Sequence, residues 1–153
     1  MSNNKGKIIF VCTGNTCRSP IAEAIAKSKV AKNIEIISRG ILVHYPSNMN
    51  DKAKKVIEEN NMVLENHISK LFNIDEVDGN TLILTMTKTH KLMLLEKYGV
   101  LENKIYTLCE YIGEFGDVED PYGESLEVYR SCYRRLEAVI SRAIIKFELE
   151  ELK

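Results

Sequence analysis

A strand, a tight loop and a helix follow one another near the start of this chain, and their order limits the fold more than any other feature. Residues 7–12 are apolar and rich in β-branched and aromatic side chains, as in a buried strand. The run Thr13–Asn15 interrupts them. A helical pattern then begins at Ser19 and Pro20, because serine is a favoured N-cap and proline suits the first helical position.

The rest of the chain repeats this alternation. We predict further strands at 34–38, 81–85 and 104–108, and helices at 50–59, 87–97 and 125–150. The last helix carries an inward stripe at near-3.6 spacing, namely Tyr129, Cys132, Tyr133, Leu136, Val139, Ile140, Ala143, Ile144 and Phe147. In helix 87–97 we expect Leu92, Met93 and Leu95 to face inward, whereas residues 62–78 show no clean period. The pattern predicts an α/β fold, a parallel sheet with helices on both faces.

Length and charge narrow the class of protein. The chain has 153 residues, which fits a single domain over 1–153, and we expect residues 1–6 to be a flexible tail. The net charge of −1 gives no strong attraction to nucleic acid or to an anionic membrane. The polar N-terminus and the short apolar run after it do not fit a secretion signal, so we expect a cytoplasmic monomer.

Cys12 and Arg18 bracket the first loop and make it a candidate phosphate site. A tight loop of this length can point successive backbone N–H groups at one anion, and the following helix adds the partial positive charge of its N-terminus. The planar guanidinium of Arg18 matches two phosphate oxygens. In that field Cys12 is expected to be a thiolate placed for in-line attack on a bound phosphoryl group, giving a phosphocysteine intermediate.

Other residues of the loop fit this interpretation. Gly14 relieves crowding, and Asn15 tolerates a positive φ. The hydroxyl of Ser19 can either cap the helix or hydrogen-bond the Cys12 thiolate, which would stabilise it as a leaving group. Alternatives are weaker: a cysteine at a strand end is often only a small buried hydrophobe, and no Gly-Lys-Ser/Thr follows the glycine. Cys12 and Cys17 lack a second ligand pair at metal-like spacing, which disfavours a zinc site. We expect no cofactor.

Hydrolysis of a phosphocysteine needs an acid for the first leaving group and then a base for water. Asp120, followed by Pro121, is the best candidate, because proline stiffens the turn and holds the preceding residue extended. An Asp-Pro pair is also common in plain turns. The assignment of Asp120 as the acid therefore depends on the presence of the cysteine loop.

The segment from Val11 to Pro20, together with Asp120-Pro121-Tyr122-Gly123, resembles the low-molecular-weight protein phosphatase family. The likeness covers nearly the whole chain in length and element order. It implies a flavodoxin-like sheet of four parallel strands and no metal. It also implies phosphorylated protein substrates and inorganic phosphate as a product. The residue roles that it implies are Cys12 as nucleophile, Arg18 as phosphate clamp, Asp120 as general acid and base, Asn15 and Ser19 as loop supports, and the backbone amides of Thr13, Gly14, Asn15, Thr16, Cys17 and Arg18 as phosphoryl ligands.

The loop is similar to that of the bacterial protein-arginine phosphatase branch. Thr16 occupies a position that is often aliphatic in tyrosine-directed relatives, and its hydroxyl could orient a guanidinium or a nearby water. We therefore expect a phosphoarginine-directed enzyme. Tyr122 is a candidate for the pocket rim, with Leu42, His44 and Tyr45 as weaker ones. Arg39 departs from the family pattern, in which a small residue is usual before the glycine.

Three alternatives stay open at this point. One is a protein-tyrosine phosphatase with the same catalytic residues. Another is arsenate reductase, which would need a cysteine relay, although Cys109 and Cys132 are far apart in sequence. The third is a phosphate-binding regulatory module without catalysis, which would need neither Cys12 nor Asp120.

Two further expectations concern cysteine and histidine. Cys17 is expected to pack under the loop and, as the resemblance implies, to form a reversible disulfide with Cys12 that protects the thiolate. His67 and His90 lie in no motif, so we expect purely structural roles for them.

Overall fold

The computed structural model describes residues 6–31 and 33–151. At its centre lies a four-stranded sheet in the order β2-β1-β3-β4. Its strands are β1 (Gly6–Cys12), β2 (Ile34–Gly40), β3 (Thr81–Thr85) and β4 (Ile105–Thr107). Every neighbouring pair runs parallel. This confirms the predicted α/β class. Gly6, expected in a flexible tail, is the first residue of β1, and residues 1–5 lie outside the described part of the chain.

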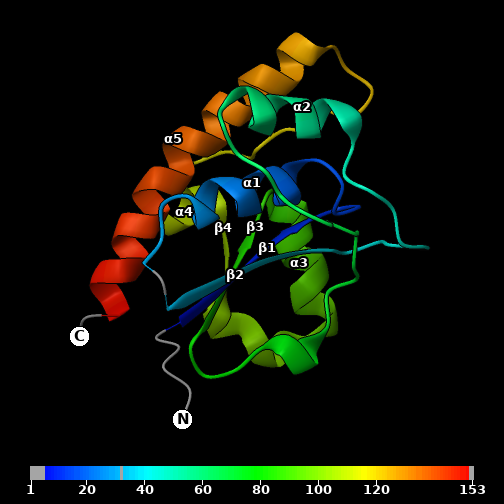
Figure 1. Cartoon of the computed structure of the whole chain (residues 1–153). Coiled ribbons are helices and arrows are strands. Elements are labelled where there is room, and N and C mark those ends of the chain that lie inside the picture. The colour runs from blue at the N-terminus through cyan, green and yellow to red at the C-terminus, as the bar shows by residue number, and fades with distance from the viewer. Residues whose placement is uncertain (1–5, 32, 152–153) are drawn as a thin grey trace.

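Helices cover the two faces of the sheet unequally (Figure 1). On one face, α1 (Arg18–Lys27), α2 (Asp51–Glu59) and the long α5 (Leu126–Glu151) pack against one another. The other face is covered by α3 (Lys88–Lys97) and the 3-10 helix η2 (Gly99–Lys104). The short α4 (Leu108–Tyr111) packs on α5, and a second 3-10 helix, η1, spans Ile74–Glu76.

Successive side chains of β1 point to opposite faces of the sheet and so belong to two separate core clusters. Ile8, Phe10 and Cys12 belong to the cluster with α1 and α5, whereas Ile9 and Val11 belong to the cluster with α3. Both sets are fully or almost fully buried. Because Cys12 continues the α1-facing set, its thiol enters the space below the start of α1.

The predicted stripe of α5 is confirmed, since all nine of its residues are buried. The expectation for α3 was wrong for Leu92 and Met93, whereas Leu95 is half-buried and packs against the core. Leu92 and Met93 are 54% and 38% exposed, and the buried residues of this helix are His90 and Leu94. Residues 92–95 are all apolar, so their pattern does not show which side of the helix is buried.

Residues 62–78, which gave no period, run mostly as extended chain beside β2. Isolated bridges join Gly40 to Leu71 and Asn48 to Ile68. Phe72 is buried against the α3 side of the sheet. This segment therefore lies beside the end of β2, next to the loop that follows β1.

Candidate active site

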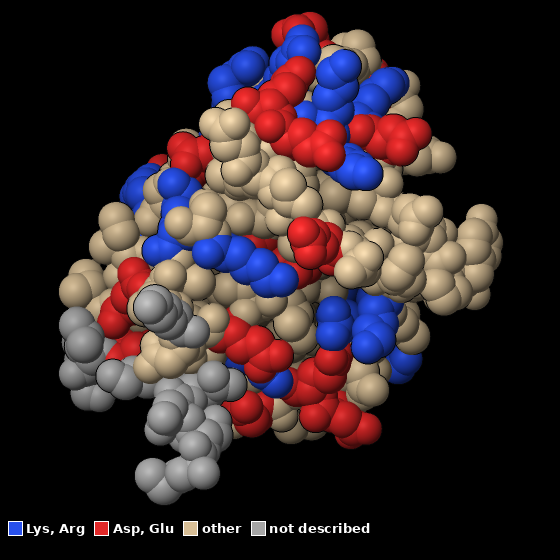
Figure 2. Space-filling view, in the orientation of Figure 1, with Lys and Arg blue, Asp and Glu red and all other residues tan. Residues whose placement is uncertain are grey.

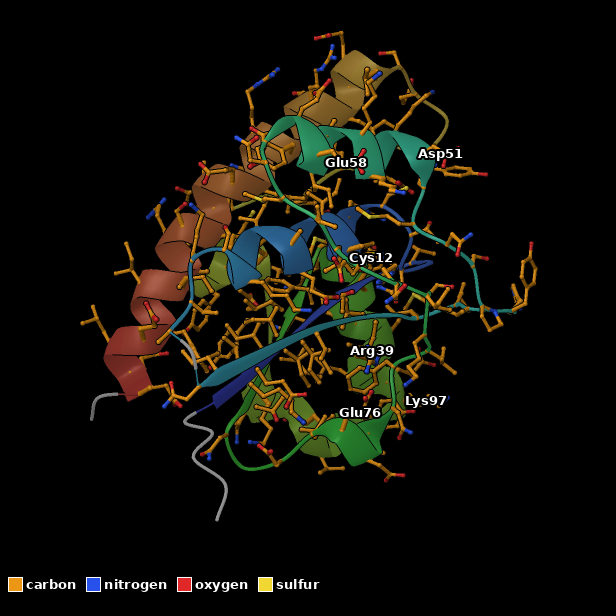
Figure 3. All side chains as sticks on the ribbon, in the orientation of Figure 1. Cys12, Arg39, Asp51, Glu58, Glu76 and Lys97 are labelled. Carbon is orange, nitrogen blue, oxygen red and sulfur yellow. The ribbon has the colours of Figure 1, made fainter. Side chains whose placement is uncertain are left out.

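The loop between β1 and α1, which contains Cys12 at its start, lies at the carboxyl end of β1 (Figure 3). The next strand in the chain, β2, lies on one side of β1, and the following one, β3, lies on the other. Ligand sites of open parallel sheets occur at this kind of position. Helix α1 begins at Arg18 with Cys17 as its N-cap residue and no side-chain cap. The predicted cap at Ser19 was therefore wrong: Ser19 is the second helical residue and Pro20 the third. The serine hydroxyl makes a different bond.

That bond is with the thiol. Ser19 Oγ lies 2.9 Å from Cys12 Sγ, and both side chains are buried. The same oxygen accepts from Asn15 Nδ2 at 2.8 Å and can donate to the Arg39 carbonyl oxygen at 3.4 Å. The arrangement is the second of the two roles predicted for Ser19, a hydrogen bond to the cysteine sulfur.

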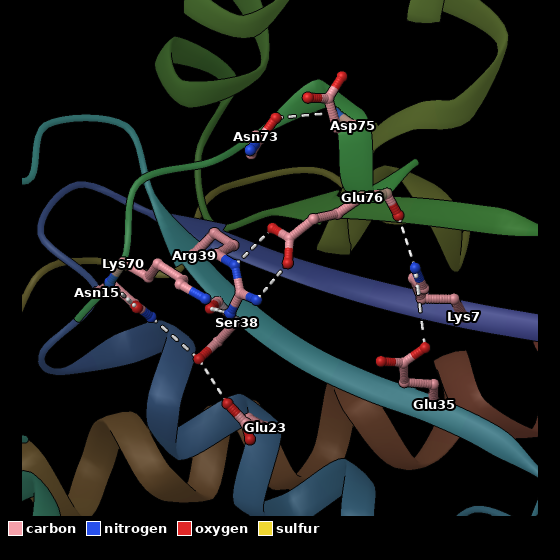
Figure 4. Close-up of polar contacts among 10 residues, drawn as sticks. All are labelled: Lys7, Asn15, Glu23, Glu35, Ser38, Arg39, Lys70, Asn73, Asp75 and Glu76. Carbon is pink, nitrogen blue, oxygen red and sulfur yellow. Dashed lines mark hydrogen bonds and ion pairs between the residues drawn. The ribbon is translucent and has the colours of Figure 1, made fainter. Parts of the chain in front are cut away.

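Asn15 supports the loop from beneath. Its φ of 59° lies in the left-handed region, as expected for a residue of this turn. Its amide nitrogen also donates to Ser38 Oγ at 3.0 Å, and its amide oxygen accepts from the Lys70 backbone at 2.9 Å. Ser38 Oγ donates in turn to Glu23 Oε1 at 2.6 Å. Figure 4 shows this buried chain between β2 and α1.

Arg18 is 4% exposed and is held by its own loop and by a distant one. Its Nη1 donates to the Val118 carbonyl at 2.9 Å, and its Nη2 donates to Thr13 Oγ1 at 3.4 Å. Nη2 also lies 3.6 Å from Asp120 Oδ2. The guanidinium therefore faces both the cysteine loop and the aspartate.

Asp120 comes from a loop more than a hundred residues downstream. Its side chain is 50% exposed, and Oδ1 accepts from the Tyr122 backbone at 3.0 Å. Pro121 is buried between them, whereas the Tyr122 ring is 71% exposed. One carboxylate oxygen is thus fixed by the turn while the other faces Arg18.

These parts enclose a cavity of about 210 Å³. Its lining residues are Cys12, Thr13, Gly14, Thr16, Cys17, Arg18, Asp120 and Tyr122. The structure therefore brings together most of the residues singled out from sequence. Asn15 and Ser19 lie buried beneath the cavity, and Leu42, His44 and Tyr45 do not line it.

The cysteines differ in their surroundings. Cys17 Sγ lies 3.4 Å from the Tyr129 hydroxyl, and burial raises the pKa of the Cys17 thiol above its ordinary value. Cys132, on the inner face of α5, is also buried, which raises the pKa of its thiol to about 12. Cys109 Sγ accepts from Arg135 Nη2 at 3.3 Å. All four cysteines are free thiols.

Sequence reasoning missed the part played by two histidines. His67 Nε2 donates to the Asn15 carbonyl oxygen at 2.8 Å, and His90 Nε2 lies 2.9 Å from Thr13 Oγ1. Both therefore contact the loop from segments 52 and 77 residues away. The one signal in the sequence was that His90 lies one turn before Leu94, the other buried residue of α3.

Arg39, which departs from the family pattern, does not enter the cavity. Its Nε and Nη2 donate to the two carboxylate oxygens of Glu76 at 2.8 and 2.6 Å, and its Nη1 donates to the Ser38 carbonyl at 2.7 Å. The pair lies on the face of β2 away from α1 (Figures 3 and 4).

The face of the molecule drawn in Figure 2 has no single sign of charge. Lys and Arg alternate with Asp and Glu over the face drawn in Figure 2, as the net charge of −1 suggests. Among the residues that the structure describes, none of the helices has both the length and the apolar character needed to cross a membrane.

Comparisons with known proteins agree with this geometry. Residues 7–152 match the family model described as low molecular weight phosphotyrosine protein phosphatase. The chain is 43% identical over 136 residues to the low molecular weight protein-tyrosine-phosphatase PtpB of Staphylococcus haemolyticus, covering 89% of this chain and 96% of that one. It is 36% identical over 146 residues to the protein-arginine-phosphatase of Geobacillus stearothermophilus, covering 95% and 98%.

Two solved structures of similar proteins have the same fold as this chain. The YwlE arginine phosphatase from Geobacillus stearothermophilus superimposes with a TM-score of 0.90 at 36% identity, over 96% of both chains. The low molecular weight protein tyrosine phosphatase from T. tengcongensis gives 0.87 at 36% identity, over 92% and 99%. The chain therefore belongs to the low-molecular-weight phosphotyrosine protein phosphatase family, enzymes whose substrates are phosphorylated proteins.

Proposed function

We propose that this protein hydrolyses phosphoarginine in proteins, with Cys12 as nucleophile, Arg18 as phosphate clamp and Asp120 as general acid and base. The observation that carries the choice of substrate is Thr16. It is half-buried and lines the cavity, and its Oγ1 lies 3.9 Å from Cys17 Sγ. A polar wall suits a guanidinium, which must keep its N–H groups hydrogen-bonded, better than it suits a phenyl ring.

The first step is attack of the Cys12 thiolate on phosphorus. The S–P bond forms as the P–N bond breaks, and Asp120 gives a proton to the leaving nitrogen. Arg18 and the backbone amides of the loop neutralise the charge that develops on the phosphoryl oxygens. The position of Asp120 Oδ2, 3.6 Å from Arg18 Nη2 at the cavity mouth, supports this role.

In the second step water attacks the phosphocysteine. Asp120, now a carboxylate, takes a proton from the water as the new P–O bond forms, and the S–P bond breaks to release phosphate. The sulfur leaves as a thiolate, and the hydroxyl of Ser19, 2.9 Å from it, stabilises that charge. The same cycle on phosphotyrosine breaks a P–O bond instead.

Two relatives carry different names, so the substrate needs a direct test. The assay is kcat/KM on matched phosphoarginine and phosphotyrosine peptides, for wild type and Thr16→Ile. We expect the wild type to prefer phosphoarginine and the variant to shift toward phosphotyrosine. A wild-type preference for phosphotyrosine would contradict the proposal and favour a protein-tyrosine phosphatase, for which the exposed Tyr122 ring at the mouth offers a stacking surface.

Catalysis itself is tested with a small aryl phosphate. The wild type should turn it over, and Cys12→Ser should not. A wild type without turnover that still binds phosphate would favour a regulatory binding module. Arsenate reduction is a weaker alternative because Asp120 would have no part in it.

A further inference from the structure

Thr13 and His90 form a polar pair at the cavity wall that the mechanism above does not use. His90 Nε2 lies 2.9 Å from Thr13 Oγ1, and Arg18 Nη2 donates to the same oxygen at 3.4 Å. Thr13 is exposed and lines the cavity, whereas His90 is 5% exposed. The side chain of Thr13 lines the cavity, and its hydroxyl oxygen is held by a guanidinium and by a buried imidazole.

The position of His90 is fixed by the start of α3. Thr87 is the N-cap, and its hydroxyl accepts from the His90 backbone at 3.1 Å. The Lys88 backbone donates to Asp117 Oδ1 at 2.9 Å, which ties this helix end to the loop that carries Asp120. The imidazole is thus aimed at Thr13 by the backbone of its own helix.

His90 is neutral at ordinary pH. Burial and the nearby charge of Arg18 lower its pKa to about 4, against the opposing effect of Asp117 and Asp120. A neutral imidazole carries one proton, on one of its two ring nitrogens. The choice between them decides where the proton of Thr13 points.

A proton on Nδ1 of His90 would be buried without an acceptor among the described residues, and orphaned buried N–H groups are rare. Thr13 would then also give its own hydrogen to His90. With the proton on Nε2, only a bare lone pair is left at Nδ1. The two lone pairs of Thr13 Oγ1 then accept from His90 and from Arg18, which can only donate. The hydroxyl proton of Thr13 is left to donate into the cavity.

We propose that Thr13 is a side-chain ligand of the phosphoryl group and that His90 is a positioning residue that directs the Thr13 proton toward it. The proposal rests on the proposed phosphatase function and adds a side-chain donor to the backbone amides and Arg18. Because this donor serves the phosphoryl oxygens and not the leaving group, it acts alike on phosphoarginine and phosphotyrosine.

The test is a double-mutant cycle read by calorimetric titration with inorganic phosphate and by kcat/KM on a small aryl phosphate. Thr13→Val removes the hydroxyl at constant shape and should weaken phosphate binding and lower kcat/KM about tenfold or more, as expected for a hydrogen bond to a charged group. Thr13→Ser, the matched control, should stay within about threefold of wild type. His90→Leu should lose severalfold in the wild-type background and nothing further in Thr13→Val, because both act through one proton.

Thermal unfolding of each variant accompanies these measurements, so that binding is compared only among folded proteins. Equal phosphate affinity for wild type and Thr13→Val would overturn the role of Thr13. A His90→Leu loss of the same size in both backgrounds would overturn the role of His90. Phosphate titration needs no turnover, so it decides this proposal even if the substrate assays contradict phosphoarginine hydrolysis. A wild type that binds no phosphate would end both proposals.

Discussion

Asn15 determines which groups donate and which accept in a buried network of hydrogen bonds. Replacing its amide nitrogen by an oxygen should reverse those roles. Its amide nitrogen donates to Ser19 Oγ at 2.8 Å and to Ser38 Oγ at 3.0 Å. Because each serine accepts from Asn15, each keeps its own proton for the next group. Ser38 gives it to the Glu23 carboxylate at 2.6 Å, and Ser19 can give it to Cys12 sulfur at 2.9 Å.

The substitution Asn15→Asp keeps the shape and tolerates the left-handed backbone, but it replaces the donor by an acceptor. Both serines would then turn their protons to the new carboxylate, and Cys12 and Glu23 would each lose a bond. A hydrogen bond to a charged group contributes about 1.5–3 kcal/mol. At 1.36 kcal/mol for each factor of ten, the loss of the Ser19 bond should slow the steps that form or release the Cys12 thiolate about ten- to hundredfold.

Stability should fall as well, in a way that depends on pH. The new carboxyl would be buried with no cation added, which costs about 3–5 kcal/mol if it stays charged. Its pKa in the folded state is therefore raised above the unfolded value of about 3.9. The penalty is absent below that unfolded value and grows as pH rises toward the folded one. The variant should be closest to wild type near pH 4 and furthest from it at pH 7.

Stopped-flow hydrolysis of p-nitrophenyl phosphate separates the burst from the steady state, and urea unfolding at pH 5 and 7 gives the stability. Ser19→Ala is the matched control, since it removes the bond to Cys12 without adding charge. It should share the kinetic loss and lack the pH-dependent destabilisation. A folded Asn15→Asp protein with both rates within twofold of wild type would refute the assigned donor and acceptor roles.

Three further predictions follow from other contacts. Asp120→Asn should lower kcat on phosphopeptides a hundredfold or more, as measured by steady-state kinetics, because the leaving group loses its acid. Arg39→Ala should lower the free energy of unfolding by about 1 kcal/mol at pH 7. Hydrogen bonds from Arg39 lower the pKa of Glu76, so this part of the stabilisation is present above the unfolded pKa and is lost as pH falls through the folded one. Urea unfolding should therefore show a smaller difference between the two proteins at acid pH than at pH 7. Peroxide should produce a reducible Cys12–Cys17 disulfide detectable by mass spectrometry, and irreversible sulfonic acid at Cys12 without that bridge would contradict it.

The long helix and the central strands could be predicted because their burial repeats along the sequence. The α5 stripe keeps a period near 3.6 from Tyr129 to Phe147, so many residues agree on which side of the helix is buried. Helix α3 has four consecutive apolar residues, 92–95, and such a run does not show which of them are buried. The expectation that Leu92 and Met93 face inward therefore had no periodic pattern behind it. The buried side of α3 includes His90, a polar residue whose partner, Thr13, lies in the loop after β1.

The active site likewise has residues that could be predicted from the sequence and residues that could not. The loop from Cys12 to Ser19 could be predicted because its functional groups are neighbours in sequence and their spacing is fixed by one turn. Asp120 was found through the chemistry that the cysteine required. His67 and His90 were not found, because a single histidine has no spacing to test and its partner is known only once the chain has folded. Long-range hydrogen bonds to a loop are the part of an active site that local pattern cannot supply.

The end of β2 explains why an arginine is tolerated beside the loop. Successive side chains of a strand point to opposite faces, so Ser38 reaches the Asn15 network while Arg39 pairs with Glu76 on the other side. Gly40 returns to the loop side, and a Cβ there would lie 2.8 Å from the Thr13 carbonyl oxygen and 3.2 Å from Asn15 Cβ. Size is therefore restricted at residues 38 and 40 but not at 39. Of the three residues, Arg39 is the one whose side chain points away from the site, and only its carbonyl oxygen, 3.4 Å from Ser19 Oγ, contacts it.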